Sequence, residues 1–188
     1  MSWLFVAKRR FGRADGDKWA HYIEWSGLRQ LREVVSLDQI LCPTVPADLV
    51  AADWEHNVHA DYLASYFRSL DYLKRRVRGE PYLNLLAVLQ NPSPADLDGP
   101  NPPGFAFLGF DVLDVHGDVS VLTNCGGFDD IFAKSELSEF GLLREASRAY
   151  RVQRDLRTAY PDDSHSECDV WAIWRMTVAD RGFKQRAT

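Results

Sequence analysis

The sequence has no apolar run that approaches the roughly 20 residues of a membrane-spanning helix, so we expect no contact with a membrane. A signal peptide is not indicated either. The apolar residues at the N-terminus, Trp3 to Ala7, come before the cationic Lys8-Arg9-Arg10, which is the reverse of the order in a signal peptide. These two features predict a cytoplasmic protein.

Cysteine is scarce. The chain has three cysteines, Cys42, Cys125 and Cys168, and their odd number and wide spacing do not fit a disulfide framework. We expect reduced and mostly buried thiols, which agrees with a cytoplasmic location.

Positive charge is not in excess. The net charge is −5, whereas a protein that binds phosphate backbones needs a basic face, so we expect no nucleic-acid partner. Phosphate-loop and dinucleotide-loop patterns are missing, as are the Gly-x-Ser-x-Gly motif and the zincin signature. The sequence therefore predicts no cofactor and no bound metal.

The composition is that of a folded protein. Hydrophobic residues make up 46% and aromatic residues 12% of the 188 residues, which is enough to build a core and too apolar for a disordered chain. We expect one domain over residues 1–188, with a frayed polar tail after Asp180.

Hydrophobic periodicity predicts an α+β fold. Apolar residues recur every three or four positions over 47–77 and again over 142–159, which predicts a long and a second amphipathic helix. β-Rich segments predict strands at 3–8, 19–25, 82–89, 105–115, 119–123 and 168–178.

We expect an antiparallel or mixed sheet of about five to six strands packed against the two helices. The first two strands form a hairpin in this scheme, and the strand at 82–89 is covered on both faces. Residues 32–42 fit either a strand or a helical turn.

A proline-rich segment follows the 82–89 strand. Five prolines and two glycines lie within residues 91–104, a composition that predicts a long loop without regular structure. Such loops are often functional, and this one is a candidate partner-binding surface.

The Asn124-Cys125-Gly126-Gly127 corner is the most pointed chemical feature. We expect it to connect a strand to a helix, so that backbone N–H groups beside Asn124, Gly126 and Gly127 could hold an anion or oxyanion. A thiol at a helix N-terminus has a lowered pKa, which would make Cys125 a nucleophile with His165 or His59 as its base. The competing interpretation is a structural turn with a small buried cysteine.

Two groups of residues are candidate metal ligands. His56 and His59 are three residues apart, and Cys125, His165 and Cys168 could share a zinc ion. Neither group has the spacing of a complete zinc motif. Surface or boundary histidines are the simpler interpretation of the first group, and nothing in the sequence fixes the geometry of the second.

Four segments resemble a group of uncharacterised bacterial proteins. They are Leu108-Gly-Phe-Asp111, Ser120-Val-Leu-Thr-Asn-Cys-Gly126, Phe140-Gly-Leu-Leu143 and Ser166-Glu-Cys-Asp-Val-Trp-Ala-Ile-Trp-Arg175. The resemblance covers less than half of the chain, and it carries no known chemistry.

We predict from these features a non-enzymatic protein-binding module, comparable with toxin-immunity proteins by analogy of size and acidity. It would meet its partner through an acidic surface or through the 91–104 loop. The alternative is a small hydrolase or transferase that uses Cys125.

Overall fold

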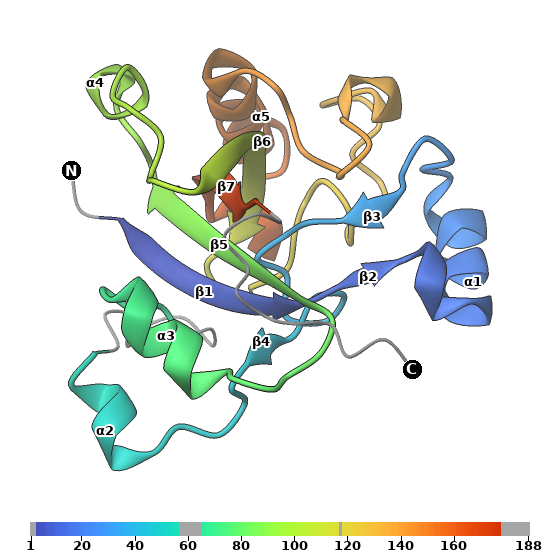
Figure 1. Ribbon diagram of the computed structural model, residues 1–188. Helices are drawn as coiled ribbons and strands as arrows, with labels where there is room; N and C mark the ends of the chain where they lie inside the picture. Colours follow the sequence, from blue (N-terminus) through green and yellow to red (C-terminus); the bar gives the residue numbers. More distant parts are fainter. Residues whose placement is uncertain (1–2, 57–64, 117, 178–188) are drawn as a thin grey trace.

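The computed structural model describes residues 3–56, 65–116 and 118–177. Five strands form one antiparallel sheet in the order β4-β1-β5-β7-β6 (Figure 1). Their bounds are β1 Leu4–Arg9, β4 Thr44–Val45, β5 Leu83–Gln90, β6 Phe105–Asp114 and β7 Cys168–Met176. A second, two-stranded sheet pairs β2 (Phe11–Gly12) with β3 (Glu33–Val34). The predicted α+β class is confirmed.

The helices are short except for the last. The α-helices are α1 Asp17–Ser26, α2 Ala51–Trp54, α3 Leu70–Arg76, α4 Pro94–Leu97 and α5 Ala146–Ala159. Three 3-10 turns cover Arg13–Asp15, Lys134–Glu136 and Ser164–Ser166. In Figure 1, α5 packs on β6 and β7, whereas α3 lies beside β1.

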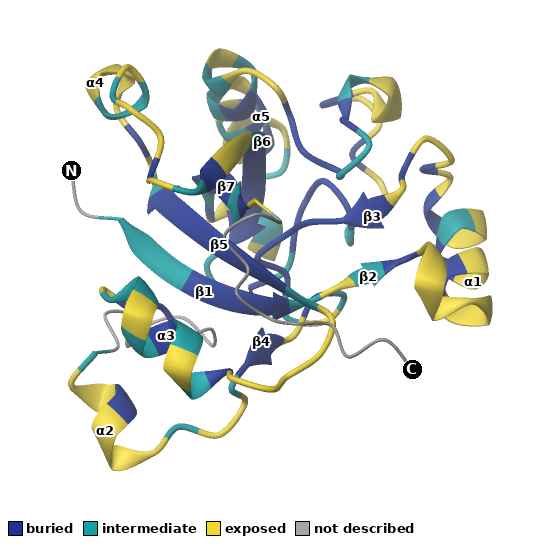
Figure 2. Ribbon diagram, in the orientation of Figure 1, coloured by how far each residue is buried: buried dark blue, intermediate teal, exposed yellow. Residues whose placement is uncertain are grey.

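Both faces of the central sheet are buried, as Figure 2 shows for β5. One face carries Ala87 and Val170 and packs against α3 and α5. The other face carries Leu86 and Trp171 and packs against loop residues such as Leu142. The near-continuous apolar sequence of β5 follows from this double coverage, and the expected strand at 82–89 is confirmed.

A β-bulge interrupts β6. The register with β7 shifts between Phe107 and Gly109, because Phe107 pairs with Trp174 and Gly109 with Ile173. Gly109 has a φ of 144°, and a Cβ there would lie 2.5 Å from the carbonyl oxygen of Leu143. Glycine is required because the 140–143 segment approaches the backbone so closely.

The expected N-terminal hairpin is wrong, because residues 19–25 lie in α1. The buried residues Trp19, Tyr22 and Ser26 recur with helical spacing. Gly27 ends the helix in a left-handed conformation with a φ of 70°. The aromatic residues of this segment therefore follow the helical period and not that of a strand.

The single helix expected over 47–77 is also wrong. Its described residues form α2 and α3, and Phe67 lies between them in an extended pair with Phe5, with both N···O distances at 2.8 Å. The side chain of Ser69 then caps α3 by accepting a hydrogen bond from the Tyr72 amide. Residues 57–64, which include His59, lie outside the described residues.

Three further expectations are corrected in detail. Residues 91–104 contain α4, where the Ser93 side chain caps a helix that begins at Pro94. The expected return strand at 119–123 is reduced to an isolated bridge between Ser120 and Leu113, followed by a turn. The ambiguous 32–42 segment begins with β3 and continues as turns and bends.

The remaining elements agree with expectation. The second helix begins at Ala146, a few residues later than expected, and the last strand ends at Met176. Residues 178–188, where we expected a frayed tail, lie outside the described residues. None of the described helices is long and apolar enough to cross a membrane.

Candidate functional site

The Asn124–Gly127 corner is fixed at one end and open at the other. The Asn124 amide donates a hydrogen bond to the buried Asp38 carboxylate at 2.9 Å, and its backbone N–H donates to the Ser120 carbonyl oxygen at 2.9 Å. Gly126 and Gly127 are exposed, and a Cβ built on either would meet no atom within 4 Å. Asn124 therefore has a structural role that leaves the two glycines open to solvent.

The expected strand-to-helix connection at this corner is wrong. Residues 121–124 form a turn, and the next helical residues are the short 3-10 turn at Lys134–Glu136. No α-helix begins at this corner, so no helix N-terminus lies beside Cys125 to lower its pKa.

Cys125, Gly126 and Gly127 line a pocket with a volume of about 90 Å³. Its walls are largely apolar, and a polar pair, Asp129 and Lys134, stands among its lining residues with 3.7 Å between Asp129 Oδ1 and Lys134 Nζ. The other lining residues are Trp25, Ser26, Leu28, Leu122, Thr123, Phe128 and Phe132. The pocket therefore lies between the end of α1 and the 122–134 segment.

The electrostatics of this pocket oppose a thiolate. Burial, reinforced by the nearby carboxylates of Asp114, Asp38 and Asp163, raises the pKa of Cys125 to about 12. The same carboxylates disfavour an anion held by the N–H groups of Gly126 and Gly127. At neutral pH the pocket therefore presents a neutral thiol among apolar walls.

His165 is close to the pocket and is engaged with carboxylates. Its Nδ1 lies 2.7 Å from Asp163 Oδ1, and its Nε2 lies 3.7 Å from Asp114 Oδ2. Its ring contacts Phe128, which lines the pocket, at a centroid distance of 5.8 Å. His165 thus contacts one residue of the pocket lining and is not itself a lining residue, while His59 lies outside the described residues.

The metal-binding alternatives gain nothing from the described residues. Within 3–56, 65–116 and 118–177, no group of three His, Cys, Asp or Glu side chains could hold a metal ion. The His56 ring packs against the Tyr72 ring in a tilted arrangement, with ring centroids 4.0 Å apart. Cys168 is fully buried, and burial raises the pKa of its thiol to about 12.

Sequence reasoning missed a buried acidic network on the face opposite α5. The Asp111 carboxylate accepts hydrogen bonds from the Ser36 and Ser120 hydroxyls at 2.5 and 2.7 Å and from the Leu37 amide at 3.3 Å. Burial raises the pKa of Asp111 to about 6 despite these donors. Asp38 accepts from the Ser120 amide as well as from Asn124, and so joins the corner to this network.

Lys8 lies beside the same network and is 1% exposed. Its ammonium group donates to the Leu37 carbonyl oxygen at 2.7 Å and to the Thr44 hydroxyl at 3.1 Å. Burial lowers its pKa to about 8, although the carboxylates of Asp38 and Asp111 oppose the shift. A charge inside an apolar strand was the signal in the sequence, because Lys8 follows Leu4–Ala7 and Asp111 follows Leu108–Phe110.

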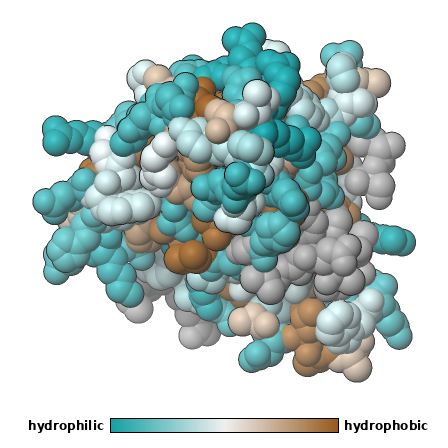
Figure 3. All heavy atoms as spheres, turned by 180° about the vertical axis from the view of Figure 1, so that it is seen from behind, coloured by the Kyte–Doolittle hydropathy of each residue, from teal (hydrophilic) through white to brown (hydrophobic). Residues whose placement is uncertain are grey.

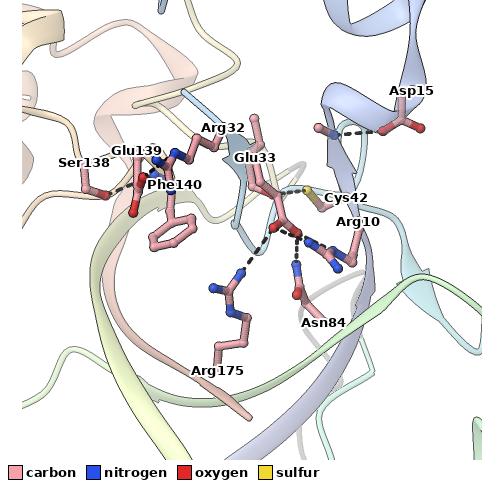
Figure 4. A network of polar contacts seen from close by, with 12 residues as sticks. Arg10, Asp15, Arg32, Glu33, Cys42, Asn84, Ser138, Glu139, Phe140 and Arg175 are labelled. Carbon is pink, nitrogen blue, oxygen red and sulfur yellow. Dashed lines mark hydrogen bonds and ion pairs between the residues drawn. The ribbon is translucent and has the colours of Figure 1, made fainter. Parts of the chain in front are cut away.

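A second missed cluster centres on Glu33 (Figure 4). Arg10 donates to both carboxylate oxygens of Glu33 at 2.8 and 2.7 Å, Asn84 donates at 2.7 Å, and Arg175 donates at 3.2 Å. Burial alone would raise the pKa of Glu33, but the hydrogen bonds and charges of these partners hold it below its usual range. The Arg175 guanidinium also lies 4.6 Å from the centroid of the Phe140 ring.

The 91–104 loop is attached to the sheet and to α5. Tyr150 donates to the Pro92 carbonyl oxygen at 2.8 Å, and the Trp174 indole donates to Asn101 at 2.7 Å. Asn91 donates to Asp169 at 2.7 Å. The loop is therefore held to the protein by side-chain hydrogen bonds, and its tip is exposed.

The segments that carry the sequence resemblance meet in space. Phe110 pairs with Leu143, Ser120 binds Asp111, and a Cβ on Gly141 would lie 2.5 Å from a Thr123 methyl group. Their contacts account for these motifs through packing and hydrogen bonding. Comparisons with family models, curated proteins and solved structures give no match.

Proposed function

We propose that this chain is a non-enzymatic protein-binding module and that the Cys125 pocket receives an anchoring side chain of its partner. One observation carries the proposal: the pocket at the corner is lined more by apolar than by polar surface, and burial raises the pKa of its Cys125 thiol to about 12. Such a hollow offers desolvation and shape to a ligand, and it lacks an activated nucleophile. Toxin-immunity proteins are one class of modules to which this description applies by analogy.

The surroundings of the pocket resemble an energetic centre of a protein interface. Trp25 is 60% exposed beside it, and the Asp129–Lys134 pair is solvent-accessible. Interfaces typically place an apolar anchor in a desolvated pocket and surround it with aromatic and polar residues.

The size of the pocket limits the anchor. A volume of about 90 Å³ is smaller than the roughly 150 Å³ of a protein cavity that binds benzene, so we expect an aliphatic anchor and not a large aromatic one. Thr123 also lines the pocket, and within the described residues its buried hydroxyl has no hydrogen-bond partner. That oxygen has almost no accessible surface, so the pocket offers a ligand mainly its apolar side chains.

The direct test uses isobutanol as a probe and amide chemical shifts as the readout. We expect isobutanol to shift the Gly127 and Phe128 amides of the wild type. Gly126→Leu should weaken these shifts, because it adds a bulky apolar side chain to a residue that lines the pocket, at a position where a Cβ meets no atom within 4 Å. Ala95→Leu is the matched control, since it adds the same side chain to the exposed α4 in the 91–104 loop.

The two variants distinguish the pocket from the 91–104 loop. Weaker isobutanol shifts in Gly126→Leu with unchanged shifts in Ala95→Leu support the pocket. The reverse pattern would contradict it. Absence of any isobutanol shift at Gly127 and Phe128 in the wild type would contradict the proposal.

The enzymatic alternative is tested by the reactivity of Cys125. Because its pKa is raised to about 12, we expect the iodoacetamide rate of the folded protein to keep rising with pH up to the highest pH at which the fold persists. Mass spectrometry of the Cys125 peptide measures the rate, and the unfolded chain gives the reference for a free thiol, near pH 8.5. A plateau below that pH would favour the hydrolase or transferase.

A further inference from the structure

The outer edge of β6 is covered along only part of its length. From Phe110 onward it is paired, because Phe110 and Leu143 exchange two backbone hydrogen bonds at 2.8 and 3.0 Å. Val112 and Asp114 continue this coverage by bonding to Val121 and Val119. Before the bulge, β6 has no strand partner on this side among residues 3–56, 65–116 and 118–177.

The backbone of Phe107 points toward this open side. Gly104 accepts a hydrogen bond from Thr177 at 2.9 Å, so the alternation of an antiparallel ladder directs the N–H and C=O of Ala106 toward β7 and those of Phe107 away from it. Phe105, which shares the outward direction, donates to the Pro102 carbonyl oxygen at 3.0 Å. Within the described part of the chain, Phe107 thus has a backbone donor and acceptor with no partner at an exposed sheet edge.

An open groove of about 750 Å³ runs beside this edge. Phe107 and Leu108 form one side, and the 135–140 segment, with Phe140, forms the other. The second wall is held in place: Ser138 donates its amide proton to the Leu142 carbonyl oxygen at 2.8 Å, and Arg175 lies against the Phe140 ring. Figure 3 shows the molecule from behind the view of Figure 1, with hydrophobic side chains in small patches among hydrophilic ones.

We propose that this groove binds an extended acidic segment of a partner protein, which adds as a strand to β6 at Phe107. Strand addition uses the unpaired backbone for affinity and the walls of the groove for side-chain selection. Phe107, 38% exposed, and Phe140 present apolar surface to alternate residues of the incoming segment. The bulge at Gly109 marks the point where the chain's own 140–143 segment takes over the edge.

Charge selects an acidic occupant. Glu139 lines the groove and is neutralised by Arg32, with an N···O distance of 2.9 Å. Arg144 also lines the groove, is exposed, and has no ion-pair partner within the described residues. In a chain with a net charge of −5, Arg144 is therefore the one charged residue of the groove lining without an ion-pair partner among the described residues, and it favours an acidic ligand.

A second copy of the chain fits less well. The groove lies between the edge of β6 and the 135–140 segment. A single strand could enter it, whereas a strand that belongs to the sheet of a second copy would bring its neighbouring strand against the 135–140 segment. Edge-to-edge pairing of two copies would also bring two Arg144 side chains toward each other. The inference does not depend on the Cys125 pocket, whose lining residues come from the 122–134 segment and α1 with its cap.

The test uses a fluorescein-labelled hexapeptide that alternates glutamate and valine, with fluorescence anisotropy and amide hydrogen exchange as readouts. We expect the peptide to bind and to slow exchange at the Phe107 amide. Arg144→Glu should weaken binding about fivefold or more, as for a charge reversal at an interface. Arg78→Glu, the same change at an exposed position of the segment that follows α3, should leave binding unchanged.

Two altered peptides distinguish strand addition from simple charge attraction. The backbone nitrogens of the peptide can be methylated in two alternate sets, or phases, of which only one faces β6. Methylation of that set should abolish binding, and methylation of the other should not. Replacement of glutamate by lysine should weaken binding. Binding that survives both methylated phases, equal effects of the two arginine variants, or no protection of Phe107 would overturn the proposal. Self-association of the wild type that protects Phe107 would also overturn it, in favour of a second copy.

Discussion

Two buried carboxylates on the same protein are held in opposite ways. Asp111 is surrounded by hydroxyl and amide donors, and its pKa is raised to about 6. Glu33 is surrounded by two arginines and an asparagine, and its pKa is lowered. Both groups are less than 10% exposed, so burial alone does not decide the direction of the shift. Cationic partners offset the cost of burying a charge, whereas neutral donors offset it only in part.

We expect the largest loss of stability from the removal of Asp111. Asp111→Ala leaves the Ser36 and Ser120 hydroxyls and the Leu37 amide without their acceptor in a fully buried site. We expect a loss of about 4 kcal/mol in the free energy of unfolding, measured by urea denaturation. Glu24→Ala, on the exposed face of α1, should change it by less than about 0.5 kcal/mol. A loss of that small size in Asp111→Ala would show that the network is not stabilising.

The opposite pKa shifts predict opposite pH dependences. The folded state binds more protons at Asp111 between its usual value, near pH 4, and its folded pKa of about 6, so its contribution to stability falls as pH rises through this window. The full shift corresponds to about 3 kcal/mol. The free energy of unfolding of the wild type minus that of Asp111→Asn should therefore fall from pH 4 to pH 7.

Glu33 should show the reverse. Its folded pKa lies below the usual 4.5, so its stabilisation is present above that pH and is lost as pH falls through the folded value. The gap between wild type and Glu33→Gln should narrow toward low pH. Urea denaturation from pH 3.5 to 7 compares both variants, and slopes of the same sign would refute the contrast between the two sites.

Removing Glu33 should cost less than removing Asp111. Glu33→Ala leaves Arg10 and Arg175 without their carboxylate, but the Arg10 side chain is 40% exposed and can be solvated. We expect a loss of about 2 kcal/mol by urea denaturation, below the usual range for breaking a fully buried pair. Glu80→Ala, which breaks an exposed pair with Arg9, should cost at most about 1 kcal/mol. A loss for Glu33→Ala as large as that for Asp111→Ala would mean that solvent does not relieve the arginines.

The strands were predictable where both faces of the sheet are buried or where apolar and polar residues alternate along a strand. β5, β6 and β7 follow from their apolar sequence, and α5 follows from its helical period. The prediction of one helix over 47–77 was wrong because Tyr66 fits a helical stripe by spacing. In the structure Tyr66 lies in an extended segment, and its ring stacks on Trp171 with ring centroids 5.1 Å apart. Long-range stacking of this kind leaves no periodic signal.

The candidate site was predictable only in outline. The glycines of the 124–127 corner marked an open turn, and Cys125 does line a pocket. The carboxylates that oppose its ionisation come from distant positions, including Asp38 and Asp163, and only the fold brings them together. The Glu33 cluster likewise draws its members from four separate strands or their ends.

The bulge at Leu108 also acts as a phase shift in the side-chain alternation of β6. In an uninterrupted strand, every second residue after Phe107 would share its face, and Asp111 would point into the apolar layer beneath α5. The inserted residue reverses that parity, so Phe110 and Val112 join the layer beneath α5 while Asp111 turns to the opposite face, where Ser36 and Ser120 meet it. Deleting Leu108 would therefore move Asp111 to the face that packs on α5 and Phe110 to the opposite face. The presence of this one residue determines which face of the sheet carries the buried carboxylate.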